Sequence, residues 1–212
     1  MALRKTILAT GEFYHVFNRS VRGLPIFKRH YDYQLFLEAA QFYLQPNPPV
    51  KFSFYRIQKK KYPLDLSQPL VTVIAYCLLP THFHFILRQE KDKGIRQFMQ
   101  KLLNSYAHYF TLKYQSRGPV FEGNFKAVRV ENEEQLLHLS RYIHLNPVSS
   151  YLVENPKDYP YSSYEIYLGE KQGLADPSTI MDNIKTENYK EFVLDRKDYQ
   201  RQLEQIKHLV LE

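Results

Sequence analysis

The feature that most constrains the fold is an apolar segment from Val71 to Leu87 that is rich in β-branched and aromatic residues. The Pro80-Thr81 pair interrupts it, so the pattern predicts two strands with a break between them. Side chains alternate between the two faces of a strand. His82 and His84 therefore share one face of the second strand, and the phenylalanines that alternate with them point into a core.

Two imidazoles held side by side on a rigid strand supply half of a divalent-metal site. The alternative is that His82 and His84 are hydrogen-bonded histidines of a sheet with no ligand. The spacing alone leaves both interpretations open, so a metal site requires a third ligand from elsewhere in the chain.

The composition predicts one globular domain with appended pieces. The chain has 212 residues, of which 44% are hydrophobic, enough for a substantial core. No apolar run reaches the length of a membrane span, and the N-terminus shows no signal-peptide pattern. The single cysteine, Cys77, cannot form an intrachain disulfide, so we expect a cytoplasmic protein.

Charge is distributed unevenly along the chain. The net charge of +7 divides into +13 over residues 1–130 and −6 over residues 131–212. A basic body of this kind favours a polyanionic partner such as nucleic acid. The alternative is an ordinary solvated basic surface.

Hydrophobic periodicity predicts the other elements. The resulting order of elements suggests an α+β protein with a small antiparallel sheet and helices packed on one face of it. The pattern does not give the order of the strands within the sheet. Besides the two strands already described, we expect strands over residues 12–20, 51–57 and 125–130, and helices over residues 30–44, 95–114, 132–146 and 187–211.

The helix expected over residues 132–146 carries a tyrosine and an asparagine four residues apart. Tyr142 and Asn146 are therefore neighbours on one helical stripe. If this helix lies near His82 and His84, two imidazoles and one amide oxygen form a neutral ligand set, which suits Mg²⁺ or Mn²⁺ holding a phosphate oxygen. Tyr142 would then be placed to attack the phosphate, giving a covalent phosphotyrosine and a 3′-hydroxyl. The alternative is that Tyr142 only packs.

These motifs resemble those of a known family. The sequence LPTHFH over residues 79–84 is similar to the HUH motif of single-tyrosine transposases, and RYIHLNPV over residues 141–148 is similar to their nucleophile helix. Residues 14–16, 118–123 and 159–163 also resemble stretches of one branch, the REP-associated tyrosine transposases. The resemblance covers roughly residues 10–165.

The resemblance implies a ferredoxin-like antiparallel sheet and a metal-dependent enzyme that nicks and joins single-stranded DNA beside hairpins. It assigns His82, His84 and Asn146 as ligands of Mg²⁺ or Mn²⁺ and Tyr142 as the nucleophile. The chain departs from the family pattern at Phe121, where tryptophan is expected, and at position 124, where asparagine replaces an expected arginine. Both departures concern DNA contacts and not the chemistry.

We therefore expect a catalytic domain over residues 1–165 and an acidic, partly helical extension over residues 166–212. The predicted partner is single-stranded or hairpin DNA, with no membrane; the family includes monomers and dimers, so the oligomeric state stays open. Two alternatives are a hairpin-binding protein without transposition activity and a metal phosphodiesterase that uses water. The candidate phosphate contacts are Arg19, Arg22, Lys126 and Arg129.

Overall fold

A computed structural model describes residues 7–182 and 184–196 of the chain. Its centre is a four-stranded antiparallel sheet with the strand order β2-β3-β1-β4. The strands are β1 (Phe13–Arg19), β2 (Val71–Leu79), β3 (His82–Gln89) and β4 (Lys126–Arg129).

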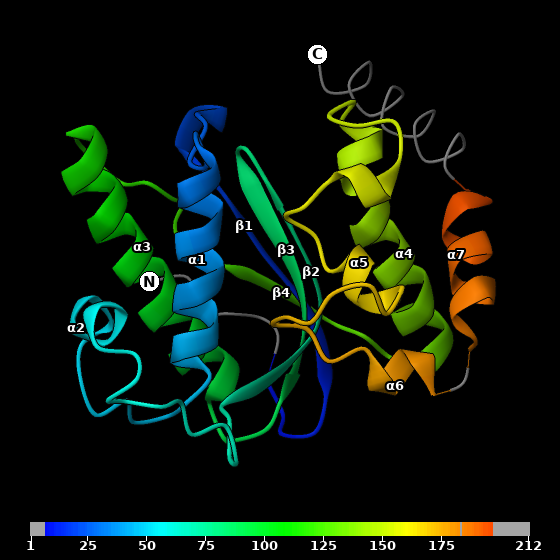
Figure 1. Ribbon diagram of the computed structural model, residues 1–212, viewed down its shortest axis with the longest axis horizontal. Coiled ribbons are helices and arrows are strands. Elements are labelled where there is room, and N and C mark those ends of the chain that lie inside the picture. Colours follow the sequence, from blue (N-terminus) through cyan, green and yellow to red (C-terminus); the bar gives the residue numbers. More distant parts are fainter. Residues whose placement is uncertain (1–6, 183, 197–212) are drawn as a thin grey trace.

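Two long helices cover one face of this sheet. They are α1 (His30–Tyr43) and α3 (Gly94–Tyr114), drawn to the left of the sheet in Figure 1. The chain order β1-α1-β2-β3-α3-β4 with this strand order is the ferredoxin-like arrangement, so the predicted fold class is confirmed. The phenylalanines of β3, Phe83 and Phe85, are fully buried beneath these helices.

The opposite face of the sheet is also covered, which corrects the expectation that helices pack on one face only. The long helix α4 (Glu133–Ser149) lies there with α5 (Tyr164–Tyr167) and α7 (Thr186–Leu194), to the right of the sheet in Figure 1. A second core forms between α4 and the sheet, and Ile86 of β3 belongs to it. The sheet is thus apolar on both faces, and each face requires its own cover.

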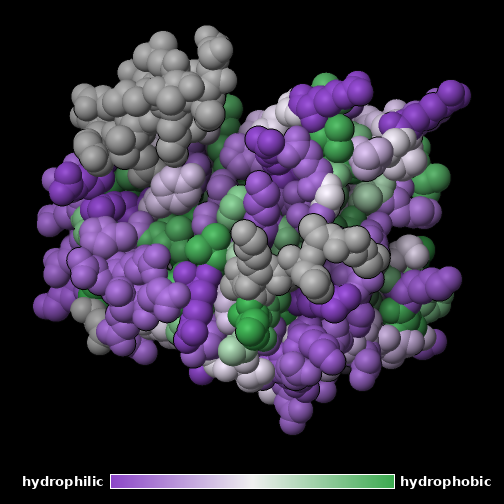
Figure 2. Space-filling view, turned by 180° about the vertical axis from the view of Figure 1, so that it is seen from behind, coloured by the Kyte–Doolittle hydropathy of each residue, from purple (hydrophilic) through white to green (hydrophobic). Residues whose placement is uncertain are grey.

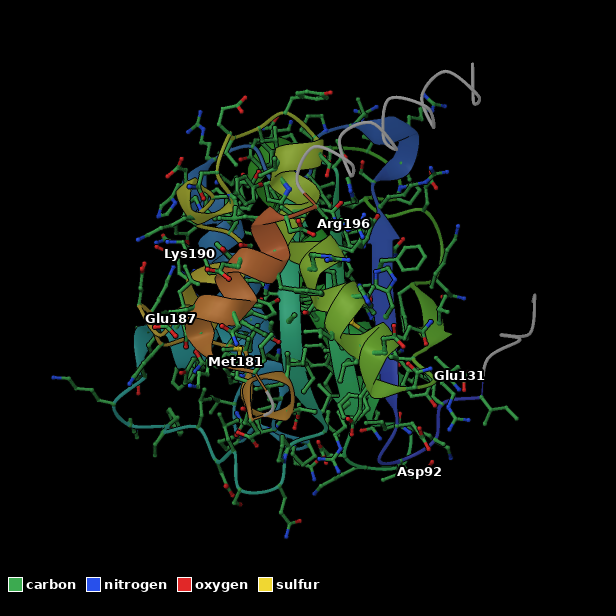
Figure 3. All side chains as sticks on the ribbon, turned by 90° about the vertical axis from the view of Figure 1, so that its right-hand side faces the viewer. Asp92, Glu131, Met181, Glu187, Lys190 and Arg196 are labelled. Carbon is green, nitrogen blue, oxygen red and sulfur yellow. The ribbon has the colours of Figure 1, made fainter. Side chains whose placement is uncertain are left out.

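The second core extends into the predicted C-terminal extension. Tyr189 and Val193 of α7 are fully buried in it, as is most of Ile180 from α6 (Ser178–Met181). Figure 3 looks onto this face and shows α7 beside α4, with Glu187 and Lys190 on α7. The expected helix over residues 187–211 is thus found as far as Leu194, and its part beyond residue 196 lies outside the described residues.

Two local predictions were wrong. The segment expected as a strand over residues 51–57 forms a short helix, α2 (Phe52–Ile57). Its apolar residues alternate only weakly, and a pattern this short fits either period. The helix expected to end near Asn146 continues through Pro147 to Ser149. Pro147 is buried there, and tertiary packing offsets the usual cost of proline within a helix.

The remaining short elements are single turns. They are the 3-10 turns η1 (Val21–Gly23) and η2 (Pro156–Asp158). The reverse side of the molecule is mostly hydrophilic, with hydrophobic residues gathered in small patches (Figure 2). In the part of the chain that the structure describes, none of the helices combines the length and the apolar character needed to cross a bilayer.

Candidate active site

The pleat of β3 presents both histidines toward α4. His82 and His84 lie opposite Leu79 and Cys77 of β2, and opposite Arg19 and Phe17 of β1. The centroids of the two imidazole rings are 5.2 Å apart, with the rings nearly perpendicular. His84 is buried and His82 is half-buried. The prediction that both side chains share the face opposite the phenylalanines holds in the structure.

Helix α4 brings the tyrosine to the histidines. The centroid of the Tyr142 ring lies 5.8 Å from that of His84, in an edge-to-face arrangement. Asn146 lies one turn later on α4, is buried, and its Nδ2 donates to the Tyr142 carbonyl oxygen at 3.0 Å. That bond orients the amide and leaves Oδ1 as its acceptor atom. The four residues singled out from the sequence are therefore brought together.

These side chains line one pocket with a volume of about 540 Å³. Its wall combines the end of β1, the β2–β3 turn, η1 and α4. The lining residues are Phe17, Asn18, Arg19, Arg22, Gly23, Thr81, His82, Phe83, His84, Glu122, Tyr142, Asn146 and Ser150.

Two of the four predicted phosphate contacts lie at this pocket. Arg19 and Arg22 line it, and the Arg19 guanidinium forms an ion pair with Glu122, whose backbone N–H also donates to the Arg19 carbonyl oxygen. Lys126 and Arg129 are on β4 and do not line the pocket. The Arg129 guanidinium instead contacts the Glu12 carboxylate at 2.8 Å.

One residue of the site was missed by the sequence reasoning. His15 of β1 is hydrogen-bonded to His84 through an Nε2 to Nδ1 distance of 2.9 Å. Burial lowers the pKa of His15 to about 4, so its ring is neutral at physiological pH. Alternation along the strand expected over residues 12–20 puts His15 and Phe17 on one face, but only the pairing of β1 with β3 brings His15 to His84.

A buried network fixes α4 against its neighbours. The His144 ring contacts the Ser163 hydroxyl through Nε2 at 2.7 Å and the Tyr189 hydroxyl through Nδ1 at 2.8 Å. Ser163 in turn accepts from the Tyr76 backbone N–H of β2 at 2.9 Å. Complete burial lowers the pKa of His144 to about 3, so the ring stays neutral. Helix α4 is therefore tied to the sheet and to α7 at its centre.

The start of α4 is also fixed by the sequence. Asn132 is its N-cap, and the Asn132 side chain accepts from the Gln135 backbone N–H at 2.8 Å. Glu133 and Glu134 occupy the first turn, where the helix dipole favours acidic groups. The predicted N-terminus of this helix is confirmed, which sets the position of Tyr142 along it.

The donor set fits a divalent ion of intermediate hardness. It contains two imidazoles and one amide oxygen. Over residues 7–182 and 184–196, no group of three or more His, Cys, Asp or Glu side chains is arranged to hold a metal ion. A site here would therefore depend on the amide of Asn146 and on oxygen atoms of the substrate or water.

The chain is similar to known proteins in both sequence and fold. No family model matches the chain. A curated Haemophilus influenzae protein, assigned by name to the REP-associated tyrosine transposases, is 27% identical over 141 residues, which is 58% of this chain and 76% of that protein. A solved structure of a REP-associated tyrosine transposase bound to a REP hairpin matches with a TM-score of 0.52 and 17% identity, covering 84% of this chain and 90% of the other.

The structural match, at 17% identity, shows a shared fold, and the sequence match shows similarity to one member of that family. In both sequence and fold, the chain resembles the REP-associated tyrosine transposases, as its motifs predicted.

Proposed function

We propose that this protein is a DNA strand transferase that cleaves and rejoins single-stranded DNA beside a hairpin. Tyr142 is the nucleophile, and His82, His84 and Asn146 hold a divalent ion, Mg²⁺ or Mn²⁺. The observation that carries the proposal is the meeting of the Tyr142 ring with that of His84, at 5.8 Å between centroids, inside a pocket that also contains Asn146.

The reaction begins with attack of the Tyr142 phenol oxygen on a DNA phosphorus atom. The new bond joins Tyr142 to the 5′-phosphate of one fragment, and the bond from phosphorus to the 3′-oxygen breaks. The phenol loses its proton and the departing 3′-oxygen gains one, so charge and atoms balance. A free phenol titrates at about pH 10, so its proton must leave as the bond to phosphorus forms.

His82, His84 and Asn146 would hold the divalent ion, which would polarise the phosphate as a Lewis acid and neutralise charge on its oxygens. The protein supplies the positions. Strand β3 fixes the imidazoles, α4 fixes the phenol and the amide, and Arg19 and Arg22 line the same pocket. A covalent phosphotyrosine keeps the energy of the phosphodiester, which rejoining requires and hydrolysis does not.

The DNA partner follows from charge and from the comparisons. Residues 1–130 carry a net charge of +13, which suits a polyanion. The related structure is described as bound to a REP hairpin, and the chain resembles that protein over most of its length. We therefore propose hairpin DNA with a single-stranded flank as the substrate.

The test uses two labelled copies of one hairpin oligonucleotide with Mn²⁺ or Mg²⁺. With a 3′-end label, the proposal predicts a labelled protein that survives denaturation, because the 5′-phosphate of that fragment is on tyrosine. With a 5′-end label, it predicts a free fragment ending in a 3′-hydroxyl. Chelation by EDTA should abolish both products.

Tyr142→Phe should remove the adduct while DNA binding persists. Tyr151→Phe is the matched control, because Tyr151 follows α4, is exposed, and does not line the pocket. Cleavage that persists in Tyr142→Phe would indicate hydrolysis by water. Tight binding without any cleavage by the wild type would indicate a hairpin-binding protein without transposition activity.

A further inference from the structure

The residue that sequence reasoning missed has a specific relation to one proposed ligand. His15 lies on β1, adjacent to β3, and its Nε2 is 2.9 Å from Nδ1 of His84. The two imidazole planes are inclined by only 21°, with centroids 5.1 Å apart. The contact is therefore a ring-to-ring hydrogen bond and requires one protonated and one unprotonated nitrogen.

The protons of this pair can be assigned from the proposed ligation. A neutral imidazole that binds a metal through Nε2 carries its proton on Nδ1. His84 would then donate from Nδ1, His15 would accept at Nε2, and the proton of His15 would lie on its own Nδ1. In the reverse arrangement, His84 would carry its proton on Nε2 and would lose the lone pair that ligation needs.

His82 supplies an independent parallel. Its Nδ1 contacts the Thr81 hydroxyl at 2.9 Å. Both histidines of β3 thus have Nδ1 engaged by a neighbouring side chain, which makes Nε2 the ligating atom of each ring. A hydroxyl donates or accepts with equal ease, whereas a neutral imidazole has one donor and one acceptor. His15 therefore restricts the tautomer of His84 more strictly than Thr81 restricts that of His82.

We propose that His15 is a positioning residue that holds His84 in the orientation and tautomer required for ligation through Nε2. This inference rests on the proposed function, because it concerns a ligand of the proposed ion. Metal-binding histidines gain affinity when the second ring nitrogen donates to a fixed acceptor. The His15 ring is itself held by Phe17, at 4.8 Å between centroids, and by the edge of Tyr142, at 6.3 Å.

The first test measures Mn²⁺ binding to the full chain without DNA, by calorimetry or electron paramagnetic resonance. His15→Phe keeps an aromatic ring but removes the acceptor, and the Kd for Mn²⁺ should rise about 10- to 100-fold. His15→Gln places an amide near the position of Nε2, and its Kd should stay within about threefold of the wild type. His138→Phe, a change at a half-exposed histidine of α4 that does not line the pocket, is the matched control and should leave the Kd unchanged.

The proposal is overturned if His15→Phe binds Mn²⁺ like the wild type, or if His15→Gln loses as much affinity as His15→Phe. The second outcome would show that an acceptor near the position of Nε2 is not enough to support Mn²⁺ binding. Circular dichroism and thermal melting verify that each variant is folded.

The second test needs no variant. Long-range proton–nitrogen correlation spectra of the ¹⁵N-labelled protein with Mg²⁺ report which nitrogen of each histidine carries the proton. The expected result is a proton on Nδ1 of His84, and a proton on Nε2 would overturn the inference. Failure of the proposed function has a different signature: His84→Ala would leave the Kd for Mn²⁺ unchanged, whatever tautomer the spectra show.

Discussion

Asp32 offers the sharpest test of how the first core is held together. Its carboxylate is fully buried in the first turn of α1 and accepts hydrogen bonds from the residues just before α1 and from α3. The donors are the backbone N–H groups of Lys28 and Arg29 at 2.9 and 2.8 Å, the Tyr109 hydroxyl at 2.6 Å, the Lys113 ammonium at 2.8 Å and the Tyr114 hydroxyl at 2.7 Å.

These bonds outweigh the cost of burial. Desolvation raises the pKa of Asp32, but the bonds from Lys113, Tyr109 and Tyr114 together lower it by more. The resulting pKa is about 2, compared with an ordinary value of 3.8. At roughly 1.4 kcal/mol per pKa unit, this depression contributes about 2 kcal/mol to the free energy of unfolding at neutral pH. Because the folded pKa is depressed, the contribution is complete above the unfolded pKa and is lost as the pH falls through 3.8 toward 2.

Asp32→Asn should therefore lower the free energy of unfolding by about 2 kcal/mol or more at pH 7, because asparagine keeps the shape but loses the charge and one acceptor. The assay is urea unfolding of both proteins at pH 7 and pH 3. The difference between them should shrink to about half at pH 3. The exposed Asp158→Asn is the control and should stay within about 0.5 kcal/mol of the wild type at both pH values. A difference that does not change with pH would refute this account of Asp32.

Three further predictions concern other parts of the chain. Tyr189→Phe removes the hydroxyl that contacts the buried ring of His144, and urea unfolding should show a loss of about 1–3 kcal/mol. Gly94→Ala places a methyl group 2.1 Å from the Leu70 carbonyl oxygen, so the start of α3 must shift. The free energy of unfolding should fall by about 1–3 kcal/mol, which thermal melting would show as a lower Tm. Arg22→Gln should weaken hairpin binding equally for every DNA sequence. It should also reduce the slope of log affinity against log salt concentration by about 1, measured by fluorescence anisotropy. An unchanged slope would exclude a phosphate contact by Arg22.

Strict alternation made β3 the most predictable part of the site. With a period of two, the pattern alone fixed which face His82 and His84 occupy, because any other register would bury imidazoles among the phenylalanines. The pair of Tyr142 and Asn146 was equally accessible, since a four-residue separation places two side chains on one helical stripe.

Features that depend on pairing between distant segments were not predictable. The contact of His15 with His84 requires the register of β1 against β3, which no local pattern contains. The second layer of helices was missed although β2 is apolar at nearly every position, a pattern typical of a strand covered on both faces. The continuation of α4 through Pro147 likewise depends on tertiary packing, which overrides a local preference.

The attachment of α4 has a consequence for any reaction at Tyr142. His144 lies two residues further along the same helix and is joined to β2 through Ser163 and to α7 through Tyr189. To move α4 away from both β2 and α7, the protein would have to break both buried contacts. On the proposed function, these contacts would hold the backbone of α4 in place between cutting and rejoining, so exchange of the DNA ends would require movement of the DNA and not of this helix.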